Sequence, residues 1–189
     1  MLASRSPRRR ALVEELGVPF RVVDTGHTDE SYPVHLMGGE IATYLAGHKS
    51  DAYTEPVKKN QILLTADTIV WKDGKELGKP LDRLEAIAMI SSLSGGTHQV
   101  FTGVCLRTEK QRREFYAVTD VKFSILEKEE IERYVDSCRP FDKAGAYGIQ
   151  EWIGYIAVES IRGSYFNVMG LPVQKVYVEL KSLIRQKRS

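Results

Sequence analysis

Apolar and polar positions alternate along the chain in patterns that predict a mixture of strands and helices. The most strongly apolar run covers residues 62–70 and is the best strand candidate. Residues 99–106 and 115–123 alternate well enough to form two strands that pair antiparallel, and residues 152–160 are predicted as another strand. Because strands and helices mix without strict βα alternation, the pattern favours the α/β class, with a mixed twisted sheet and flanking helices.

Five other segments show the spacing and end signals of helices. The first has Ser6 at the N-cap, Pro7 at the first helical position and Gly17 just after its end. The second covers residues 40–53, and the third begins at Asp82 and is closed by Gly95 and Gly96. The fourth covers residues 127–137, and the last runs from Pro172 to Ile184. Before the helix at Asp82, the dipeptide Asp73-Gly74 predicts a hairpin turn.

Lys49 lies on the apolar face of the helix predicted over residues 40–53. It comes four residues after Leu45 and seven after Ala42, so its ammonium is directed inward or into a cleft. The alternative is a lysine whose stem packs while its charged end reaches water. Position alone leaves both interpretations open.

Asp67 lies inside the apolar run 62–70, where an ionised carboxylate is costly unless a cation, a metal ion or a donor network compensates it. Basic residues elsewhere in the chain are therefore its expected partners. A structural acid that caps a neighbouring turn is the alternative interpretation. The misfit makes Asp67 the first candidate for a functional group.

The first predicted helix carries its charges in the reverse of the favourable order. Arg8, Arg9 and Arg10 lie at the positive end of the helix dipole, and two glutamates lie near the negative end. A bound anion explains this arrangement, because free backbone N–H groups near Ser6 and the arginine guanidinium groups all suit phosphate oxygens. A solvated basic turn, or a small patch for RNA binding or import, remains open on these residues alone.

The composition predicts one globular domain over residues 1–184, followed by a basic tail at 185–189. The chain has 189 residues, 42% of them hydrophobic, and a net charge of +2, which gives no general attraction to nucleic acid or membranes. Cys105 and Cys138 lie far apart without a metal-binding pattern and read as core residues. No apolar stretch approaches the ~20 residues of a membrane helix, so a cytoplasmic location is predicted.

Together these residues form a set suited to metal-assisted cleavage of a polyphosphate. Asp67 and the acidic loop residues Asp29 and Glu30 suit Mg²⁺ or Mn²⁺ and can take a proton from water. Lysines at positions 49, 79 and 143 can neutralise the charge on a leaving pyrophosphate. No Walker A or GxGxxG motif is present, which argues against a P-loop or dinucleotide site.

Several ordered motifs resemble those of the Maf family of nucleoside triphosphate pyrophosphatases. The resemblance runs from residue 2 to the last helix and rests on these segments: residues 2–9 (LASRSPRR), 66–70 (ADTIV), 78–80 (GKP), 93–95 (LSG), 142–150 (DKAGAYGIQ), 163–165 (GSY) and 169–172 (MGLP). It implies an elongated α/β fold similar to the inosine triphosphate pyrophosphatases. Two lobes with a central cleft are expected, often assembled as a homodimer.

The resemblance also implies an activity and a set of site residues. Members hydrolyse a nucleoside triphosphate to the monophosphate and pyrophosphate with a divalent cation. Asp67 then corresponds to the proton acceptor, and Asp29, Glu30 and Asp67 to the metal or water ligands, with the choice between Asp29 and Glu30 left open. The residues assigned to substrate binding are Ser4, Ser6, Arg8, Arg9, Lys49, Thr68, Lys79, Lys143 and Gln150.

Arg8, Thr68 and Gln150 resemble the residues of the branch that acts on dTTP and UTP. The Gln150 amide offers a donor and an acceptor to a base edge, and Thr68 adds a hydroxyl beside Asp67. The predicted substrates are therefore pyrimidine nucleoside triphosphates. The alternatives are the same chemistry on 7-methyl-GTP or another modified nucleotide and, more remotely, a nucleotide- or RNA-binding regulator, although no stable nucleic-acid partner is expected.

Overall fold

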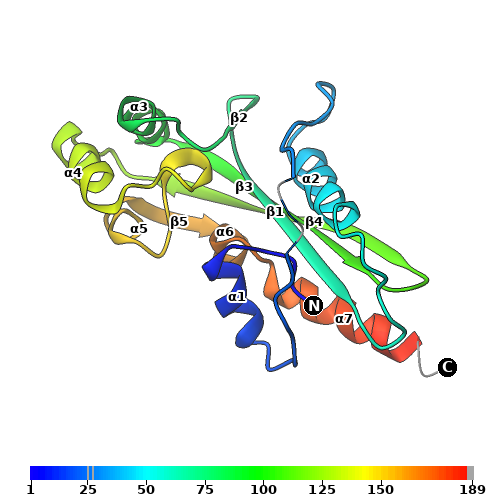
Figure 1. Cartoon of the computed structure of the whole chain (residues 1–189). Coiled ribbons are helices and arrows are strands. Elements are labelled where there is room, and N and C mark those ends of the chain that lie inside the picture. The colour runs from blue at the N-terminus through cyan, green and yellow to red at the C-terminus, as the bar shows by residue number, and fades with distance from the viewer. Residues whose placement is uncertain (25, 27, 187–189) are drawn as a thin grey trace. The chain divides into compact units, whose positions relative to one another are not determined.

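The computed structural model describes residues 1–24, 26 and 28–186, and the chain within it divides into two compact units (Figure 1). Unit 1 comprises Met1–Asp67, Thr102–Ala117 and the chain from Gly170 onward. Unit 2 comprises Thr68–Phe101 and Val118–Met169. The long strands pass from one unit into the other, so each unit contains part of the sheet.

The sheet has five strands in the order β2-β1-β3-β4-β5. Their bounds are Leu63–Lys72 for β1, Lys75–Leu77 for β2, Thr97–Arg107 for β3, Arg112–Phe123 for β4 and Val158–Arg162 for β5. The hairpin predicted at Asp73-Gly74 is confirmed, because β1 and β2 pair antiparallel and both turn residues have positive φ, 50° and 79°. Parallel bridges join Leu2 to Val22 and to Leu64, so the strand pairing is mixed.

Seven α-helices and a short 3₁₀ turn accompany the sheet in the described residues. Their bounds are α1 Pro7–Glu14, α2 Gly39–Asp51, α3 Arg83–Leu93, α4 Lys128–Cys138, η1 Ala144–Ala146, α5 Trp152–Ala157, α6 Tyr165–Met169 and α7 Val173–Gln186. The predicted α/β class with helices flanking a sheet is confirmed. Helix α7 continues into the predicted basic tail as far as Gln186, and tail residues 187–189 lie outside the described residues.

In unit 1, alternate residues of β4 face different helices. Arg112 and Glu114 lie against α2 at Gly47, and Tyr116 lies against α2 at Gly39. Arg113, on the opposite face, pairs with Glu179 of α7 at 2.8 Å. Because successive side chains of a strand point to opposite faces, α2 and α7 cover the two sides of this part of the sheet.

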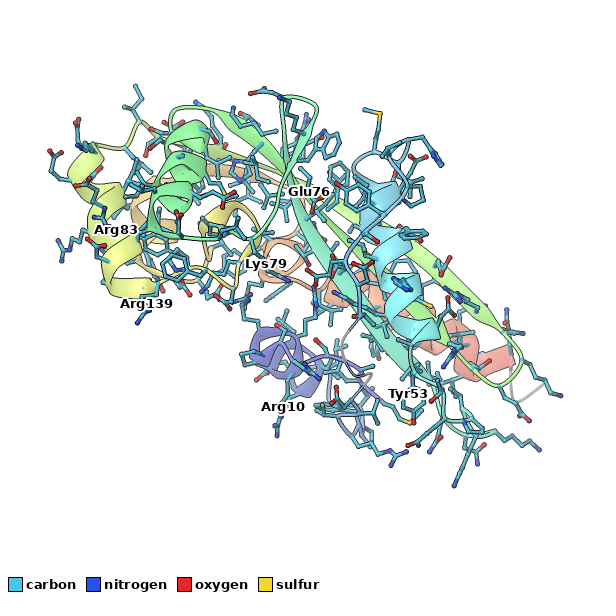
Figure 2. All side chains as sticks on the ribbon, turned by 45° about the horizontal axis from the view of Figure 1, so that its top comes forward. Arg10, Tyr53, Glu76, Lys79, Arg83 and Arg139 are labelled. Atoms are coloured by element: carbon cyan, nitrogen blue, oxygen red, sulfur yellow. The ribbon has the colours of Figure 1, made fainter. Side chains whose placement is uncertain are left out.

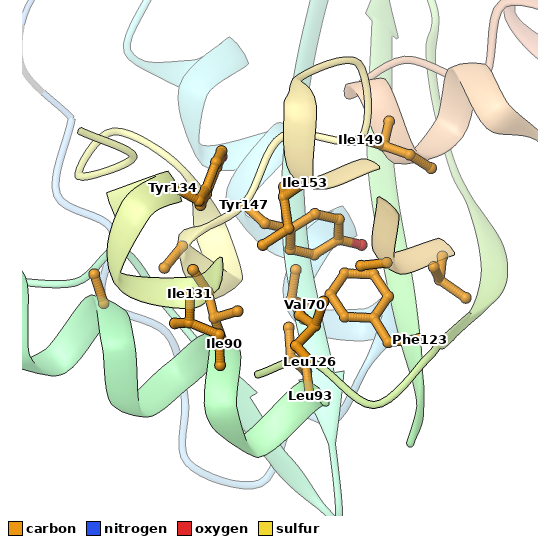
Figure 3. Packing of buried hydrophobic residues seen from close by; sticks show 14 of the residues in the cluster. Val70, Ile90, Leu93, Phe123, Leu126, Ile131, Tyr134, Tyr147, Ile149 and Ile153 are labelled. Carbon is orange, nitrogen blue, oxygen red and sulfur yellow. The ribbon is translucent and has the colours of Figure 1, made fainter. Parts of the chain in front are cut away.

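In unit 2, one large hydrophobic cluster joins the sheet to α3, α4 and α5 (Figure 3). Its centre includes Phe123 of β4, Tyr134 of α4 and Ile153 of α5, none of which is exposed to solvent. Helix α4 begins with a capping box, in which Glu127 and Glu130 each accept a hydrogen bond from the other's backbone. The segment from Asp142 to Glu151 is therefore carried by a well-packed core.

The strand predicted over residues 152–160 is wrong for its first part, because residues 152–157 form helix α5 and the strand β5 begins only at Val158. The buried residues of α5 are Ile153 and Ala157, which are four positions apart, as a helix face requires. A Cβ on Gly154 would lie 1.8 Å from the Ile149 carbonyl oxygen. Gly154 therefore lets this helical turn pack against the backbone of Ile149. The nearly continuous apolar run of the sequence gives no sign of this contact.

No helix in the described part of the chain is long and apolar enough to cross a membrane. Both cysteines are free: Cys105 is buried and Cys138 is partly buried. The prediction that they are ordinary packing residues agrees with their contacts, because Cys138 lies at the edge of the unit 2 cluster. The single-domain boundary at residue 184 stays a prediction.

A buried histidine in unit 2 predicts that the protein loses stability in acid. His98 is 2% exposed and shares a 2.8 Å hydrogen bond with the Tyr147 hydroxyl. Burial, with a smaller contribution from Lys72, lowers the pKa of His98 from 6.5 to about 4. Between these values the unfolded chain binds a proton that the folded chain does not, so the free energy of unfolding falls as the pH decreases from 6.5 to 4, by about 3 kcal/mol.

Urea unfolding at a series of pH values measures this dependence. A His98→Gln variant keeps a polar partner for Tyr147 but cannot titrate, so its free energy of unfolding should vary less with pH between 6.5 and 4. Equal pH dependence in the variant and the unmodified protein would show that His98 is not the group responsible.

Candidate active site

Asp67 lies on β1 with its side chain paired to Lys49 of α2. The Lys49 ammonium donates to Asp67 Oδ1 and also to Glu30 Oε1, at 3.2 Å from the latter. The side chains of Asp67 and Lys49 are 11% and 17% exposed, whereas that of Glu30 is 47% exposed. The prediction that Asp67 has a cationic partner is confirmed, and Lys49 is directed inward rather than toward water.

The fold brings Lys49 to Asp67 through the periodicities of a strand and a helix. Thr65 and Asp67 share one face of β1, and the Thr65 hydroxyl donates to the Ala46 carbonyl of α2 at 2.7 Å. Lys49 is three residues after Ala46, so it lies on the same side of α2. The Thr65 hydrogen bond thus holds α2 in the position where Lys49 reaches Asp67, two residues after Thr65 on β1.

The N-terminus of α1 is brought beside β1 by the parallel pairing of residues 1–3. The Ala3 amide donates to the Leu64 carbonyl at 2.9 Å, so the chain after Ala3 runs in the same direction as the chain toward Asp67. Ser6 caps α1 by accepting from the Arg9 amide at 3.4 Å, and the Ser4 hydroxyl accepts from the Ser6 amide at 3.2 Å. The predicted N-cap of this helix is confirmed.

Arg9 is held in the same part of unit 1. Its Nε donates to the Gly170 carbonyl at 2.8 Å. Burial lowers the pKa of Arg9, Asp67 and Glu30 oppose that effect, and Arg8 adds to it. Arg9 therefore interacts electrostatically with Arg8, Glu30 and Asp67. Arg10 instead extends from α1 into solvent and pairs with Glu14 at 3.1 Å (Figure 2).

The sequence left open whether Asp29 or Glu30 is a metal ligand. Glu30 is the one that shares a partner with Asp67, because both carboxylates accept a hydrogen bond from the Lys49 ammonium. Asp29 is exposed and accepts hydrogen bonds from the hydroxyl and amide of Ser31, which lower the pKa of Asp29. Among the described residues, no three His, Cys, Asp or Glu side chains are grouped closely enough to hold a metal ion.

The other predicted substrate-binding residues belong to unit 2. Thr68 follows Asp67 directly on β1 and is partly buried, and Lys79 is exposed on the segment after β2 (Figure 2). Gln150 is partly buried in a turn before α5. Lys143 is buried, and its ammonium pairs with Asp142 at 2.7 Å and with Glu151 at 3.1 Å.

Sequence reasoning missed three groups that hold predicted site residues in place. The Gly170 carbonyl binds Arg9, and Glu151 and Tyr134 lie around the turn that carries Gln150. The motif at residues 169–172 gave a signal for Gly170, but a backbone carbonyl carries no sequence signature. Glu151 follows the motif that ends at Gln150, and Tyr134 had no signal apart from its place on the apolar face of α4.

Comparisons with known proteins find similarity along nearly the whole chain. A family model described as Maf-like protein matches residues 1–183. A Bacteroides thetaiotaomicron protein named dTTP/UTP pyrophosphatase is 56% identical over 183 residues, which cover 97% of this chain and 95% of that protein. A protein of the same name from Phocaeicola vulgatus is 51% identical, and the match covers 97% of this chain and 95% of that protein. Another, from Porphyromonas gingivalis, is 47% identical, and the match covers 96% of this chain and 92% of that protein.

Proposed function

Because the chain belongs to the Maf-like protein family, we propose that it is a nucleoside triphosphate pyrophosphatase that hydrolyses dTTP and UTP to the monophosphate and pyrophosphate. The names of its relatives support the reaction and the substrates. The structural observation that carries the proposal is the nearly buried Asp67 carboxylate, paired with Lys49 in the unit that also contains the capped N-terminus of α1.

In this reaction Asp67 acts as the general base. Its carboxylate takes a proton from a water molecule while the water oxygen forms a bond to the α-phosphorus. The bond between the α-phosphorus and the α,β-bridging oxygen breaks, and pyrophosphate leaves with the electron pair. The position of Asp67 on a strand supports this role, because a general base must be held within hydrogen-bond reach of the proton that it takes.

The α1 segment and Lys49 serve the phosphates. Ser4, Ser6, Arg8 and Arg9 supply hydroxyl, backbone and guanidinium groups around the N-terminus of α1, where the helix dipole favours an anion. The Lys49 ammonium has three N–H donors, and Asp67 and Glu30 accept two of them. The third donor suits a phosphate oxygen.

Four residues of unit 2 are also predicted to bind the substrate. Thr68 and Gln150 contact the pyrimidine, because their hydroxyl and amide groups can match the donors and acceptors of a base edge. Lys79 carries a positive charge that suits the substrate phosphates, and direct contact of Lys143 with the substrate stays a prediction. The homodimer and the cytoplasmic location also stay predictions.

A divalent cation, Mg²⁺ or Mn²⁺, fits the carboxylates present. Asp67 and Glu30 already converge on one cation, the Lys49 ammonium. Mg²⁺ in phosphate-transfer sites is held by one or two carboxylates together with substrate phosphates rather than by a cage of protein ligands. Asp67 and Glu30 would hold the ion, and Asp29 stays the predicted alternative to Glu30. When bound, the ion would neutralise charge that develops on the phosphate oxygens.

A substrate panel tests the proposal. Incubation with dTTP or UTP and Mg²⁺ is expected to yield monophosphate and pyrophosphate in equal amounts, as chromatography of the products would show. EDTA should stop the reaction, and excess Mg²⁺ or Mn²⁺ should restore it. Release of diphosphate and phosphate would contradict the mechanism, and a preference for 7-methyl-GTP would favour the alternative substrate.

A further inference from the structure

Tyr134, Lys143 and Glu151 surround the turn that carries Gln150. We propose that these three side chains form a positioning network that holds the turn Gly148–Glu151, and with it the Gln150 amide, in the geometry that selects a pyrimidine base. This inference rests on the proposed function, because it assigns base recognition to Gln150. It differs from the role predicted for Lys143, which was contact with the substrate itself.

One buried hydroxyl joins the two ends of the turn. Tyr134 of α4 is fully buried, and its hydroxyl accepts from the Gly148 amide at 3.0 Å. The same hydroxyl donates to Glu151 Oε2 at 2.5 Å. The turn is also closed by the Glu151 amide, which donates to the Gly148 carbonyl at 2.9 Å. Tyr134 therefore fixes the residues on both sides of Ile149 and Gln150.

Lys143 holds the other oxygen of the Glu151 carboxylate. Its ammonium lies 3.1 Å from Glu151 Oε1 and 2.7 Å from Asp142 Oδ1. The Lys143 side chain is only 9% exposed, and two carboxylates neutralise it inside unit 2. Because Tyr134 binds Oε2 and Lys143 binds Oε1, both the position and the plane of the carboxylate are set.

Gly148 is the residue that allows the carboxylate to lie over the turn. A Cβ at this position would lie 2.8 Å from Glu151 Cδ and 3.0 Å from Oε2. The neighbours Ile149 and Ile153 are buried in the hydrophobic cluster (Figure 3). The backbone on both sides of Gln150 is thus packed, while Gln150 itself remains partly exposed.

The protonation state of Tyr134 suits this role. Burial raises the pKa of Tyr134, and the hydrogen bond to Glu151 raises it further. The hydroxyl therefore stays protonated and keeps donating to Glu151 across the working range of pH. Recognition of a base edge by an amide depends on placement within about 0.5 Å. Loss of the network should therefore weaken base discrimination much more than the chemical step.

The test compares base discrimination in single variants of the full chain. For the unmodified protein, Tyr134→Phe and Glu151→Gln, kcat and KM are measured with dTTP, UTP and GTP. We expect the preference for dTTP over GTP, as the ratio of kcat/KM values, to fall at least about 10-fold in both variants. The change should come mainly from a higher KM for dTTP, with kcat altered by no more than a few fold.

Matched controls and a third variant separate positioning from general loss of structure. Tyr155→Phe removes a hydroxyl from a side chain that is 79% exposed, and Glu132→Gln removes a carboxylate from the surface of α4, so both should keep the preference. Gly148→Ala leaves Tyr134 and Glu151 in the chain but displaces the carboxylate, and should reduce the preference. If Tyr134→Phe does not fold, the preference of the Gly148→Ala variant for dTTP over GTP tests the inference in its place.

Lys143 distinguishes the two roles directly. If Lys143 positions the turn, Lys143→Met should raise KM for dTTP more than KM for GTP. A lysine that bound the phosphates would raise both equally, and that result would overturn the inference. A preference for dTTP that Tyr134→Phe, Glu151→Gln and Gly148→Ala all retain would overturn it as well. No hydrolysis by the unmodified protein would overturn the proposed function and the inference together.

Discussion

Replacing Asp67 with Asn is expected to lower kcat for dTTP by about 10²–10⁴-fold, the usual contribution of a general base. The amide has nearly the same shape and can still accept a hydrogen bond from Lys49, which also keeps Glu30 as a partner. It cannot take a proton from water at neutral pH. Steady-state release of pyrophosphate measures the loss, and the thermal unfolding midpoint shows whether the fold is kept.

The hairpin that follows the same strand supplies a matched control. Asp73 lies just after β1, its side chain is 84% exposed, and its φ of 50° is one that Asn also adopts readily. Asp73→Asn therefore makes the same chemical change without touching the site, and its kcat should equal that of the unmodified protein. Full activity of the Asp67→Asn variant would remove Asp67 from the role of base.

A cationic partner for Asp67 was predictable from the apolar run around it, but the sequence did not identify Lys49 as that partner. The apolar run identified the strand, and helical spacing put Lys49 on the buried face of α2. Spacing left open whether the Lys49 ammonium turns inward or reaches water, and its hydrogen bond to Asp67 shows that it turns inward. The N-cap at Ser6 and the turn at Asp73-Gly74 were predictable, since each is decided by a few adjacent residues.

The contacts that were missed depend on how the chain packs in three dimensions, which helix or strand periodicity does not give. Arg9 binds the carbonyl of Gly170, which lies 161 residues later in the chain. Helix α5 was taken for a strand because its apolar residues are nearly continuous, and the contact of Gly154 with the Ile149 carbonyl becomes visible only in the fold. Lys143 and Glu151 are eight residues apart, and their pairing depends on the turn between them.

Gly103 in β3 is another residue whose importance the sequence does not reveal, and Gly103→Ala should be strongly destabilising. A Cβ at this position would lie 2.1 Å from the Ala42 carbonyl oxygen and 2.4 Å from the Thr43 nitrogen, both in the backbone of α2. Side-chain rotation cannot relieve such contacts. We expect a loss of about 4 kcal/mol, above the ~1–3 kcal/mol usual for overpacking, and a midpoint about 10 °C lower.

Gly78→Ala is the control for this loss, because a Cβ at position 78 meets no atom within 4 Å. Its unfolding midpoint should stay within a few degrees of that of the unmodified protein. In the Gly103→Ala variant, α2 must move away from β3 by about 1 Å, and Lys49 moves with it. Activity measured below the midpoint should therefore fall, because Lys49 no longer meets Asp67. A variant with normal stability would show that α2 and β3 are farther apart than the structure places them.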